Sequence, residues 1–182
     1  MRKLPAIQTL ESRVVYENRW MKVREDAIRR GDGSDGIYGF VDKPDFVIIL
    51  PIEDGMVHLV EQYRYPIKRR QWELPQGSWE ADANARPEDL ARGELQEETG
   101  LIAGVITLIG ELYPLYGMAT QKYRAYFATE LQAGTSSPDH EEQDLITRAF
   151  PLQTVEEMIV SGEIQDANTV AVLGLARLRR LL

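Results

Sequence analysis

The chain lacks cysteine entirely and has only two histidines among its 182 residues. The absence of cysteine excludes disulfide bonds, a thiolate nucleophile and any zinc or iron–sulfur site with cysteine ligands. The longest strongly apolar run, at 46–52, is far too short to span a bilayer. The N-terminal segment begins with basic residues but contains no apolar run of the kind found in secretory signals. We therefore expect a soluble, cytoplasmic protein with no membrane partner.

Basic residues are in the minority, since 29 acids stand against 21 lysines and arginines and give a net charge of −8. Two short segments hold nearly all of this charge. Residues 80–98 contain seven acids and two arginines, a net charge of −5, and residues 139–144 contain four acids and no base. A protein that binds a nucleic-acid backbone by itself usually carries a basic stripe, so we expect no nucleic-acid partner. Concentrated carboxylates favour a divalent cation, which can bring a phosphate substrate with it.

The length and the apolar fraction of 43% predict one packed domain, or one domain with an arm. Strand patterns occur at 14–16 and 20–23, followed by a loose glycine-rich loop at 30–36, and then at 46–50, 56–64, 105–112, 122–128 and 145–150. Helix patterns occur at 87–99, 152–160 and 167–182. Mixed strands with three helices predict an α/β or α+β sandwich.

Three glutamates in the first predicted helix, Glu94, Glu97 and Glu98, are spaced at i, i+3 and i+4. On a helix they fall within one arc of roughly 100°. Like charges at this spacing disfavour the helix by about 0.2–0.5 kcal/mol per pair. The spacing alone leaves two interpretations open, a solvated acidic face and a divalent-metal site for phosphoryl chemistry.

The wider string at 77–101, GSWEADANARPEDLARGELQEETGL, closely resembles the Nudix box, G-x5-E-x7-R-E-U-x-E-E-x-G-U with U aliphatic. The half ELQEETGL at 94–101 matches completely, and ELPQG at 73–77 is similar to the strand that leads into the box. The resemblance covers most of the chain from about residue 46. It implies a Nudix-type α/β/α sandwich with a mixed β-sheet and an N-terminal β arm. We assign 1–45 to the arm, for dimerisation and substrate stacking, and 46–182 to the Nudix hydrolase domain.

The box departs from the family pattern at two points. Gly93 stands where the family has arginine, and a two-residue insertion between Gly77 and Glu94 leaves Ala83 or Ala85 where the family has its first glutamate. In the family those two residues mainly support the fold and orient the metal-binding side chains. Every metal-binding carboxylate survives, so the resemblance implies that Mg²⁺ or Mn²⁺ is held by Glu94, Glu97, Glu98 and the main-chain carbonyl of Gln76.

Three further segments resemble the branch of the family that cleaves ADP-ribose and nucleoside-diphosphate sugars. They are VEQYRYP at 60–66, Glu80 three residues after Gly77, and SGEIQDANTV at 161–170. The resemblance implies that Arg64 and Glu80 face the substrate, and that Tyr16 and Trp20 in the arm stack on its base across a homodimer. Gln121 stands where this branch commonly has a substrate-contacting glutamate, which weakens the resemblance to enzymes of ADP-ribose itself relative to other nucleotide sugars.

The same branch takes its general base from an acidic loop before the last strand, here 136–144. The resemblance places Glu141 on the base. Gln143 replaces a second loop glutamate, so Glu142 is a further catalytic candidate, and a slip of one residue would exchange the two roles. His140 is a weaker candidate, because a histidine in a surface loop needs no such role. Glu97 also belongs to the predicted catalytic set.

The predicted reaction is metal-dependent hydrolysis of a nucleoside-diphosphate sugar, of the ADP-ribose or GDP-mannose type, to a nucleoside monophosphate and a sugar phosphate. WELPQG at 72–77 also resembles dinucleoside-polyphosphate and RNA 5′-end pyrophosphohydrolases, which are the alternative. An alternative of another class is a non-catalytic Nudix sensor of nucleotide sugars.

Overall fold

The computed structural model describes residues 7–78, 86–137 and 144–182. Within it the chain forms two compact units, one made of residues 1–45 and 115–122, the other of 46–114 and 123–182. The smaller unit therefore contains a segment, 115–122, that is separated along the chain from the rest of that unit by residues 46–114.

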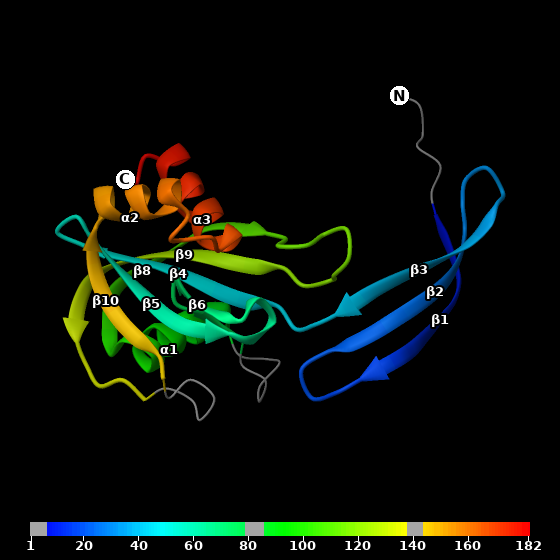
Figure 1. The fold of residues 1–182 in the computed structure, drawn as a ribbon, viewed down its shortest axis with the longest axis horizontal. Helices are drawn as coiled ribbons and strands as arrows, with labels where there is room; N and C mark the ends of the chain where they lie inside the picture. Colours follow the sequence, from blue (N-terminus) through cyan, green and yellow to red (C-terminus); the bar gives the residue numbers. More distant parts are fainter. Residues whose placement is uncertain (1–6, 79–85, 138–143) are drawn as a thin grey trace. The chain divides into compact units, whose positions relative to one another are not determined.

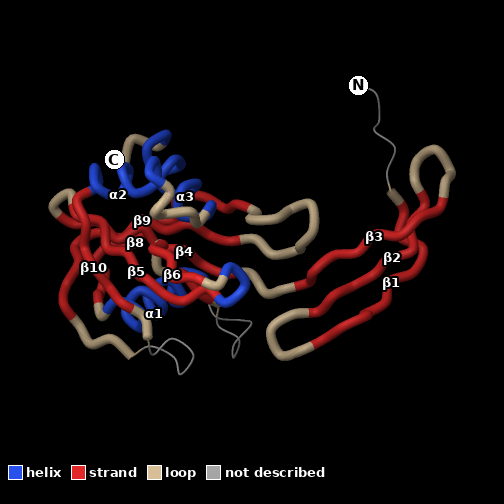
Figure 2. Tube along the Cα trace, viewed as in Figure 1, coloured by secondary structure: helices blue, strands red, loops and turns tan. Residues whose placement is uncertain are grey.

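The smaller unit is a three-stranded antiparallel sheet in the order β1-β2-β3, formed by β1 (Gln8–Glu17), β2 (Lys22–Arg29) and β3 (Asp35–Asp42). The strands predicted at 14–16 and 20–23 correspond to β1 and to the start of β2, and both are longer than predicted. The loose loop predicted at 30–36 is wrong, and the strand β3 was not predicted. Gly33 takes a φ of +86°, the left-handed region that glycine adopts without strain, and Arg30 N donates to Ser34 O at 2.8 Å. The glycine-rich segment is thus a tight turn, and the residues after it pair with β2 as a third strand (Figures 1 and 2).

Segment 115–122 joins this unit through backbone hydrogen bonds on both sides of Val41. Val41 N donates to Met118 O at 2.8 Å, and Thr120 N donates to Val41 O at 2.9 Å. Tyr38 Oη also donates to Gly117 O at 2.8 Å. These bonds fix the segment against β3.

The larger unit contains a seven-stranded mixed sheet in the order β10-β5-β4-β9-β8, with β6 paired to β5 and β7 paired to β4. Its strands are β4 (Phe46–Glu53), β5 (Met56–Arg64), β6 (Arg69–Glu73), β7 (Gln76–Gly77), β8 (Leu101–Leu112), β9 (Tyr123–Ala133) and β10 (Ile146–Pro151). β4 and β9 are parallel, and the other pairs are antiparallel. The predicted turn between β4 and β5 is confirmed, and both Asp54 and Gly55 have positive φ, as in a type I′ hairpin turn.

Helices cover both faces of the central strand β4, whose middle residues are completely buried. Val47 and Ile49 pack with Leu95 of α1 (Pro87–Thr99), while Ile48 and Leu50 lie in the cluster that includes α2 (Leu152–Ser161) and α3 (Ala167–Leu178). Period-two alternation therefore sends neighbouring residues into opposite cores. The predicted α/β/α sandwich with a mixed sheet is confirmed (Figure 1).

The first helix occupies the predicted residues 87–99. Pro87 stands in the first turn with Glu88 and Asp89, and Gly100 closes the helix at a φ of +71°. The last helix is shorter than predicted, because Arg180 turns into the left-handed region and Leu181 N donates back to Ala176 O at 3.0 Å. Within the described ranges, no helix has the length and apolar character needed to cross a membrane.

Candidate active site

The carboxylate face of α1 is largely withdrawn from solvent. Glu94 is 8% exposed, Glu98 is 1% exposed, and Glu97 is half-buried. Acidic side chains are almost never fully buried unless they are paired or bind a metal. This burial excludes the interpretation of the three glutamates as a solvated acidic face.

The short strand β7 lies against this face and shapes it. Gln76 N donates to Glu98 Oε2 at 3.1 Å. A Cβ at position 77 would collide with the carboxylate of Glu94, so only glycine lets that side chain approach the strand. The segment Gln76–Gly77 and the glutamates Glu94 and Glu98 of α1 therefore lie together.

The last turn of α1 is held from two other segments. Thr147 Oγ1, on β10, donates to Glu98 O at 2.9 Å, and Ser137 N donates to Glu97 O at 3.1 Å. Carbonyl groups in the last turn of a helix have no partner within the helix. These two bonds supply partners and fix the backbone that carries Glu97 and Glu98.

An ion pair between a buried carboxylate and a half-buried arginine lies beside the carboxylate face. Arg64 Nε donates to Glu73 Oε2 at 3.1 Å, and a second guanidinium nitrogen, Nη2, pairs with Glu73 Oε1. Burial raises the pKa of Glu73, and the charge of Arg64 and a hydrogen bond with the Gln76 side chain partly oppose that rise. Burial alone would lower the pKa of Arg64, but the charges of Glu73, Glu98 and Asp166 outweigh it and leave that pKa above its ordinary value.

The remaining predicted substrate residues that are described belong to the smaller unit. Tyr16 and Trp20 are exposed, and the guanidinium of Arg19 lies 4.1 Å from the centroid of the Trp20 ring. Gln121 Nε2 donates to Pro44 O at 2.7 Å. That bond gives Gln121 a structural role in joining segment 115–122 to the end of the arm.

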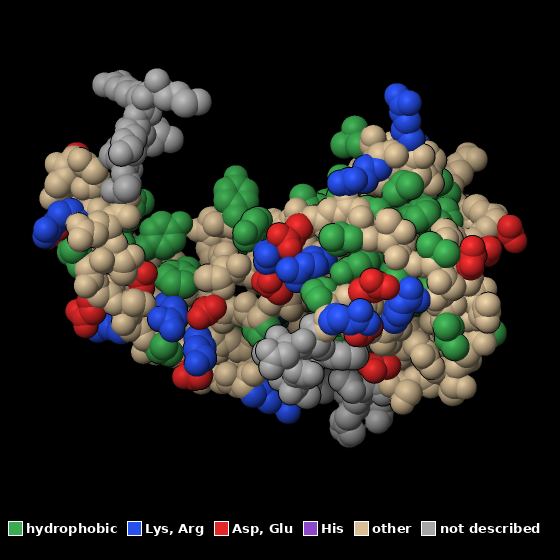
Figure 3. Space-filling view, turned by 180° about the vertical axis from the view of Figure 1, so that it is seen from behind, with side chains coloured by type: hydrophobic (Ala, Val, Ile, Leu, Met, Phe, Trp, Pro, Cys, Tyr) green, Lys and Arg blue, Asp and Glu red, His purple; other side chains and the backbone are tan. Residues whose placement is uncertain are grey.

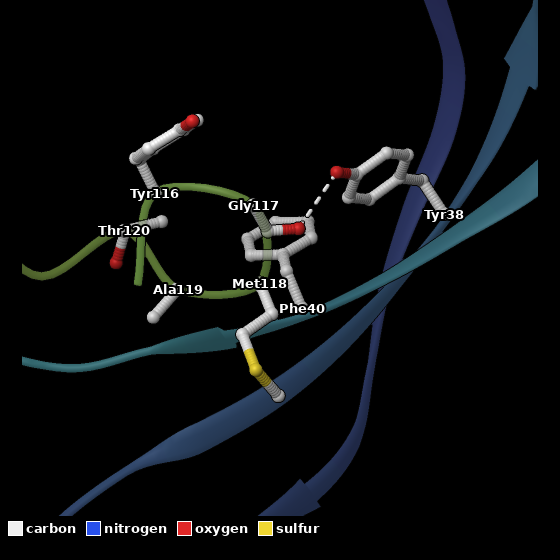
Figure 4. A pocket seen from close by; sticks show the side chains of 7 residues that line it. All are labelled: Tyr38, Phe40, Tyr116, Gly117, Met118, Ala119 and Thr120. Atoms are coloured by element: carbon white, nitrogen blue, oxygen red, sulfur yellow. Dashed lines mark hydrogen bonds between the residues drawn. The ribbon is translucent and has the colours of Figure 1, made fainter. Parts of the chain in front are cut away.

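The smaller unit also contains a shallow pocket that sequence analysis did not predict. Tyr38 and Phe40 on β3 lie on one side, and the loop at 116–120 lies opposite (Figure 4). The hydrogen bond from Tyr38 to Gly117 holds the tyrosine ring against the loop. Tyr38 and Phe40 are two residues apart, the spacing that places side chains on one face of a strand, but sequence analysis predicted no strand at 35–42.

Four predicted residues, Glu80, His140, Glu141 and Glu142, lie outside the described residues.

Among the residues that are described, no three or more histidine, aspartate or glutamate side chains are gathered at the spacing of a metal-ligand set. The donors that are present nevertheless suit a hard divalent cation, because they are carboxylates and a backbone carbonyl. The close approach of Glu94 to Gly77 and the burial of Glu98 beside Gln76 are the structural observations that fit such an ion.

Sequence reasoning assigned no role to two acids that the structure places next to these residues. Glu73 is 2% exposed and pairs with Arg64. Asp166 caps α3 by accepting from Thr169 N at 2.8 Å, while Thr169 Oγ1 accepts from Leu74 N at 2.9 Å. The spacing of Asp166 and Thr169 is a helix N-cap signal that could have been read from the sequence. Glu73 begins the ELPQG string at 73–77, but that resemblance gave it no role of its own.

Charged side chains elsewhere on the surface are mixed in sign. On the face drawn in Figure 3, lysines and arginines lie next to aspartates and glutamates. The ion pairs of the described residues include Arg70 with Asp144 at 2.6 Å and Arg86 with Asp89 at 2.7 Å. Exposed pairs of this kind contribute only about 0–1 kcal/mol each to stability.

A mixed sheet between helices, with a buried carboxylate face packed on the short strand Gln76–Gly77, defines an α/β/α sandwich whose candidate site is built from carboxylates. Comparison with known proteins identifies the family. Residues 42–172 match the family model of the NUDIX domain, and residues 7–41 match that of the nucleoside diphosphate sugar hydrolase N-terminal domain. The chain belongs to the Nudix family, and it is a pyrophosphatase; Nudix pyrophosphatases need a divalent metal ion.

Curated relatives and a solved structure agree with this assignment. The chain is 30% identical over 169 residues to an ADP-ribose pyrophosphatase of Mycobacterium tuberculosis, covering 92% of this chain and 80% of the relative. It is 25% identical to an ADP-ribose pyrophosphatase of Bacillus subtilis, covering 96% and 95%. A GDP-mannose pyrophosphatase of Escherichia coli is 31% identical over 101 residues, about half of each chain. In fold, the chain is similar to the crystal structure of an ADP compounds hydrolase, with a TM-score of 0.83, 22% identity and coverage of 96% and 93%.

Proposed function

We propose that this protein hydrolyses the diphosphate bond of nucleoside-diphosphate sugars of the ADP-ribose or GDP-mannose type. The products are a nucleoside monophosphate and a sugar phosphate. The observation that carries the proposal is the buried carboxylate face of α1, packed on Gln76 and Gly77 within a Nudix domain. The N-terminal domain match and the names of the relatives support the sugar substrate.

The metal proposed for this site is Mg²⁺ or Mn²⁺, held by Glu94, Glu97 and Glu98 with the main-chain carbonyl of Gln76. A bound divalent ion supplies electrostatic stabilisation of the charge that develops on the diphosphate oxygens. The protein's own contribution is to orient Glu94 and Glu98, which the bond from Gln76 N and the close approach of Glu94 to Gly77 support.

A carboxylate outside α1 is proposed as the general base. Glu141 accepts the proton of the attacking water, with Glu142 as the second candidate, and Glu97 completes the catalytic set. Arg64, Glu80 and Gln121 are proposed to contact the substrate. Tyr16 and Trp20, which are exposed, offer aromatic faces for the nucleoside base. The pocket lined by Tyr38 and Phe40 offers further aromatic side chains in the same unit.

The arm is proposed to form a homodimer. All ten residues of β1 are exposed, including the apolar Leu10, Val14 and Val15. Exposed apolar strands at the edge of a sheet are usually covered by a partner. We place the second copy of this chain there.

Sedimentation at micromolar concentration is therefore expected to give twice the monomer mass of 20.7 kDa. Val14→Lys puts a charge on the exposed face of β1 and is expected to shift the protein towards monomer with the sheet intact. Val160→Lys is the matched control, because that valine is 89% exposed at the end of α2. A wild-type protein that sediments only as a fully active monomer would remove this part of the proposal.

A substrate panel tests the reaction. ADP-ribose, GDP-mannose, UDP-glucose, diadenosine polyphosphates and capped RNA are incubated with the protein and Mg²⁺, and kcat/KM is compared. We expect the highest kcat/KM for a nucleoside-diphosphate sugar, by at least about tenfold, which corresponds to about 1.4 kcal/mol of transition-state stabilisation. Preference for the diadenosine polyphosphates or capped RNA would support the alternative enzymes, and binding of sugars without turnover would support a non-catalytic sensor.

A further inference from the structure

The step from β6 to β7 carries the chain from one pairing partner in the sheet to another. β6 is paired with β5 as far as Glu73, and β7 is paired with β4 from Gln76 onwards. Leu74 and Pro75, which lie between, have no register partner in either pair. Proline has no N–H, so the backbone donors of this step are those of Leu74 and Gln76. The sheet alone therefore does not fix the step that leads to Gln76.

Side chains of two helices accept from both of these donors. Leu74 is completely buried, and its N–H donates to Thr169 Oγ1 of α3 at 2.9 Å. Gln76 N donates to Glu98 Oε2 of α1 at 3.1 Å. A buried backbone N–H that loses its partner is costly, so each bond restricts where the strand can lie. The step is thus held by α3 on one face of the sheet and by α1 on the other.

The hydroxyl of Thr169 is itself oriented by a neighbouring carboxylate. Thr169 is completely buried in the first turn of α3, and its Oγ1 donates to Asp166 Oδ2 at 2.8 Å. The same oxygen accepts from Thr169 N at 2.8 Å, which is the N-cap bond of the helix. A hydroxyl whose proton is engaged has its lone pairs left for a donor, and Leu74 N is that donor. A second bond, from Gln165 N to Gln71 Oε1 at 3.1 Å, joins the same turn to β6.

We propose that Thr169 is a positioning residue of the metal site. Its hydroxyl holds Leu74 N and thereby places both the main-chain carbonyl of Gln76 and the N–H of Gln76 that orients Glu98. The inference rests on the proposed function, because it takes Gln76 and Glu98 as metal ligands. It assigns to Thr169 no contact with the metal, the substrate or the reacting atoms.

The test measures binding of Mn²⁺ to the full chain by electron paramagnetic resonance of the unbound ion. Thr169→Val keeps the shape of the side chain and removes the hydroxyl. The N–H of Leu74 must then find another partner, and Gln76 moves with it. We expect the Kd for Mn²⁺ to rise about 10–100-fold, the range found when a group that orients a metal ligand is removed. Thr169→Ser retains the hydroxyl and is expected to bind Mn²⁺ as tightly as wild type.

Val172→Ala is the matched control, because it loosens the same helix without removing the bond to Leu74. Val172 is completely buried in the core beneath α3, so the truncation is expected to lower the melting temperature and leave the Kd for Mn²⁺ unchanged. A merely structural role for Thr169 predicts otherwise, since any loosening of α3 would then weaken binding. The inference is overturned if Val172→Ala or Thr169→Ser binds Mn²⁺ as weakly as Thr169→Val, or if Thr169→Val binds it normally.

Amide hydrogen exchange of the metal-free protein tests the same bond without any metal. The Leu74 amide is expected to exchange slowly in wild type and in Thr169→Ser, and faster in Thr169→Val. Equal protection in Thr169→Val would contradict the inference. If Thr169→Val does not fold, Thr169→Ala takes its place, because alanine favours the helix and also lacks the hydroxyl. The same outcomes then decide.

Glu98→Gln separates this inference from the proposed function. Weaker Mn²⁺ binding in Glu98→Gln together with normal binding in Thr169→Val overturns the role of Thr169 alone. Normal binding in Glu98→Gln overturns the proposed metal site, and the role of Thr169 with it.

Discussion

Replacing Glu98 with glutamine is expected to lower kcat by at least about a thousandfold, or about 4 kcal/mol of transition-state stabilisation, while the fold remains intact. The loss follows from removing a buried negative charge from the proposed metal site. The fold is retained because glutamine has nearly the same shape, and its amide oxygen can still accept from Gln76 N, which donates to Glu98 at 3.1 Å. Steady-state kinetics with Mg²⁺ and thermal unfolding of both proteins provide the measurement.

Glu88→Gln is the matched control on the same helix. Glu88 lies in the first turn and pairs with Arg92 at 3.3 Å, with half of its side chain exposed. Losing such a pair costs about 0.2–1 kcal/mol of stability and no catalysis. Turnover near the wild-type value in Glu98→Gln, or an equal loss in Glu88→Gln, would contradict the assignment of the carboxylate face.

The second large effect is expected at Glu141, where replacement by glutamine should lower kcat by at least about a hundredfold with little change in KM. A positioned general base contributes about 10²–10⁴-fold to the rate. Because the base acts on the water in the transition state, its loss appears in kcat and leaves ground-state binding nearly unchanged. Glu142→Gln is expected to have the smaller effect, and both are measured with the preferred substrate of the panel.

Asp139→Asn is the matched control, since it removes one charge from the same acidic cluster without touching either candidate base. If Glu142→Gln has the larger effect, the register of the resemblance is wrong by one residue. If neither variant loses about tenfold in kcat, the base lies outside this loop.

The elements that could be predicted from the sequence are those with local signals. The helix at 87–99 begins at Pro87 and is capped by Gly100, and both residues act on the backbone within one turn. The buried strand β4 was predicted from its β-branched run, and the turn after it from Asp54 and Gly55. The glutamates of α1 were found by their spacing and by the resemblance to the Nudix box.

The features that could not be predicted depend on pairing between strands. β3 contains few buried apolar residues, so its pattern is weak, and it exists because it pairs with β2 from Asp35 to Asp42. Arg64 and Glu73 are not opposite each other in the register of β5 and β6, where Glu73 pairs with Val60. Their ion pair depends on a long side chain that reaches along the sheet. No spacing rule in the sequence predicts such a contact.

The central claim is that the carboxylate face of α1 supports hydrolysis of a diphosphate, and one measurement tests it most directly. ADP-ribose and GDP-mannose are incubated in ¹⁸O-labelled water with wild-type protein and Mg²⁺, and the products are followed by phosphorus NMR. Two control reactions are run, one with a chelator added and one with Glu98→Gln in place of the wild-type protein. We expect each molecule consumed to give one nucleoside monophosphate and one sugar phosphate, with a single ¹⁸O in one of the two phosphates, and almost no product in either control. Cleavage that continues at the same rate with the chelator or in Glu98→Gln, or no cleavage of either sugar by the wild-type protein, would contradict the account.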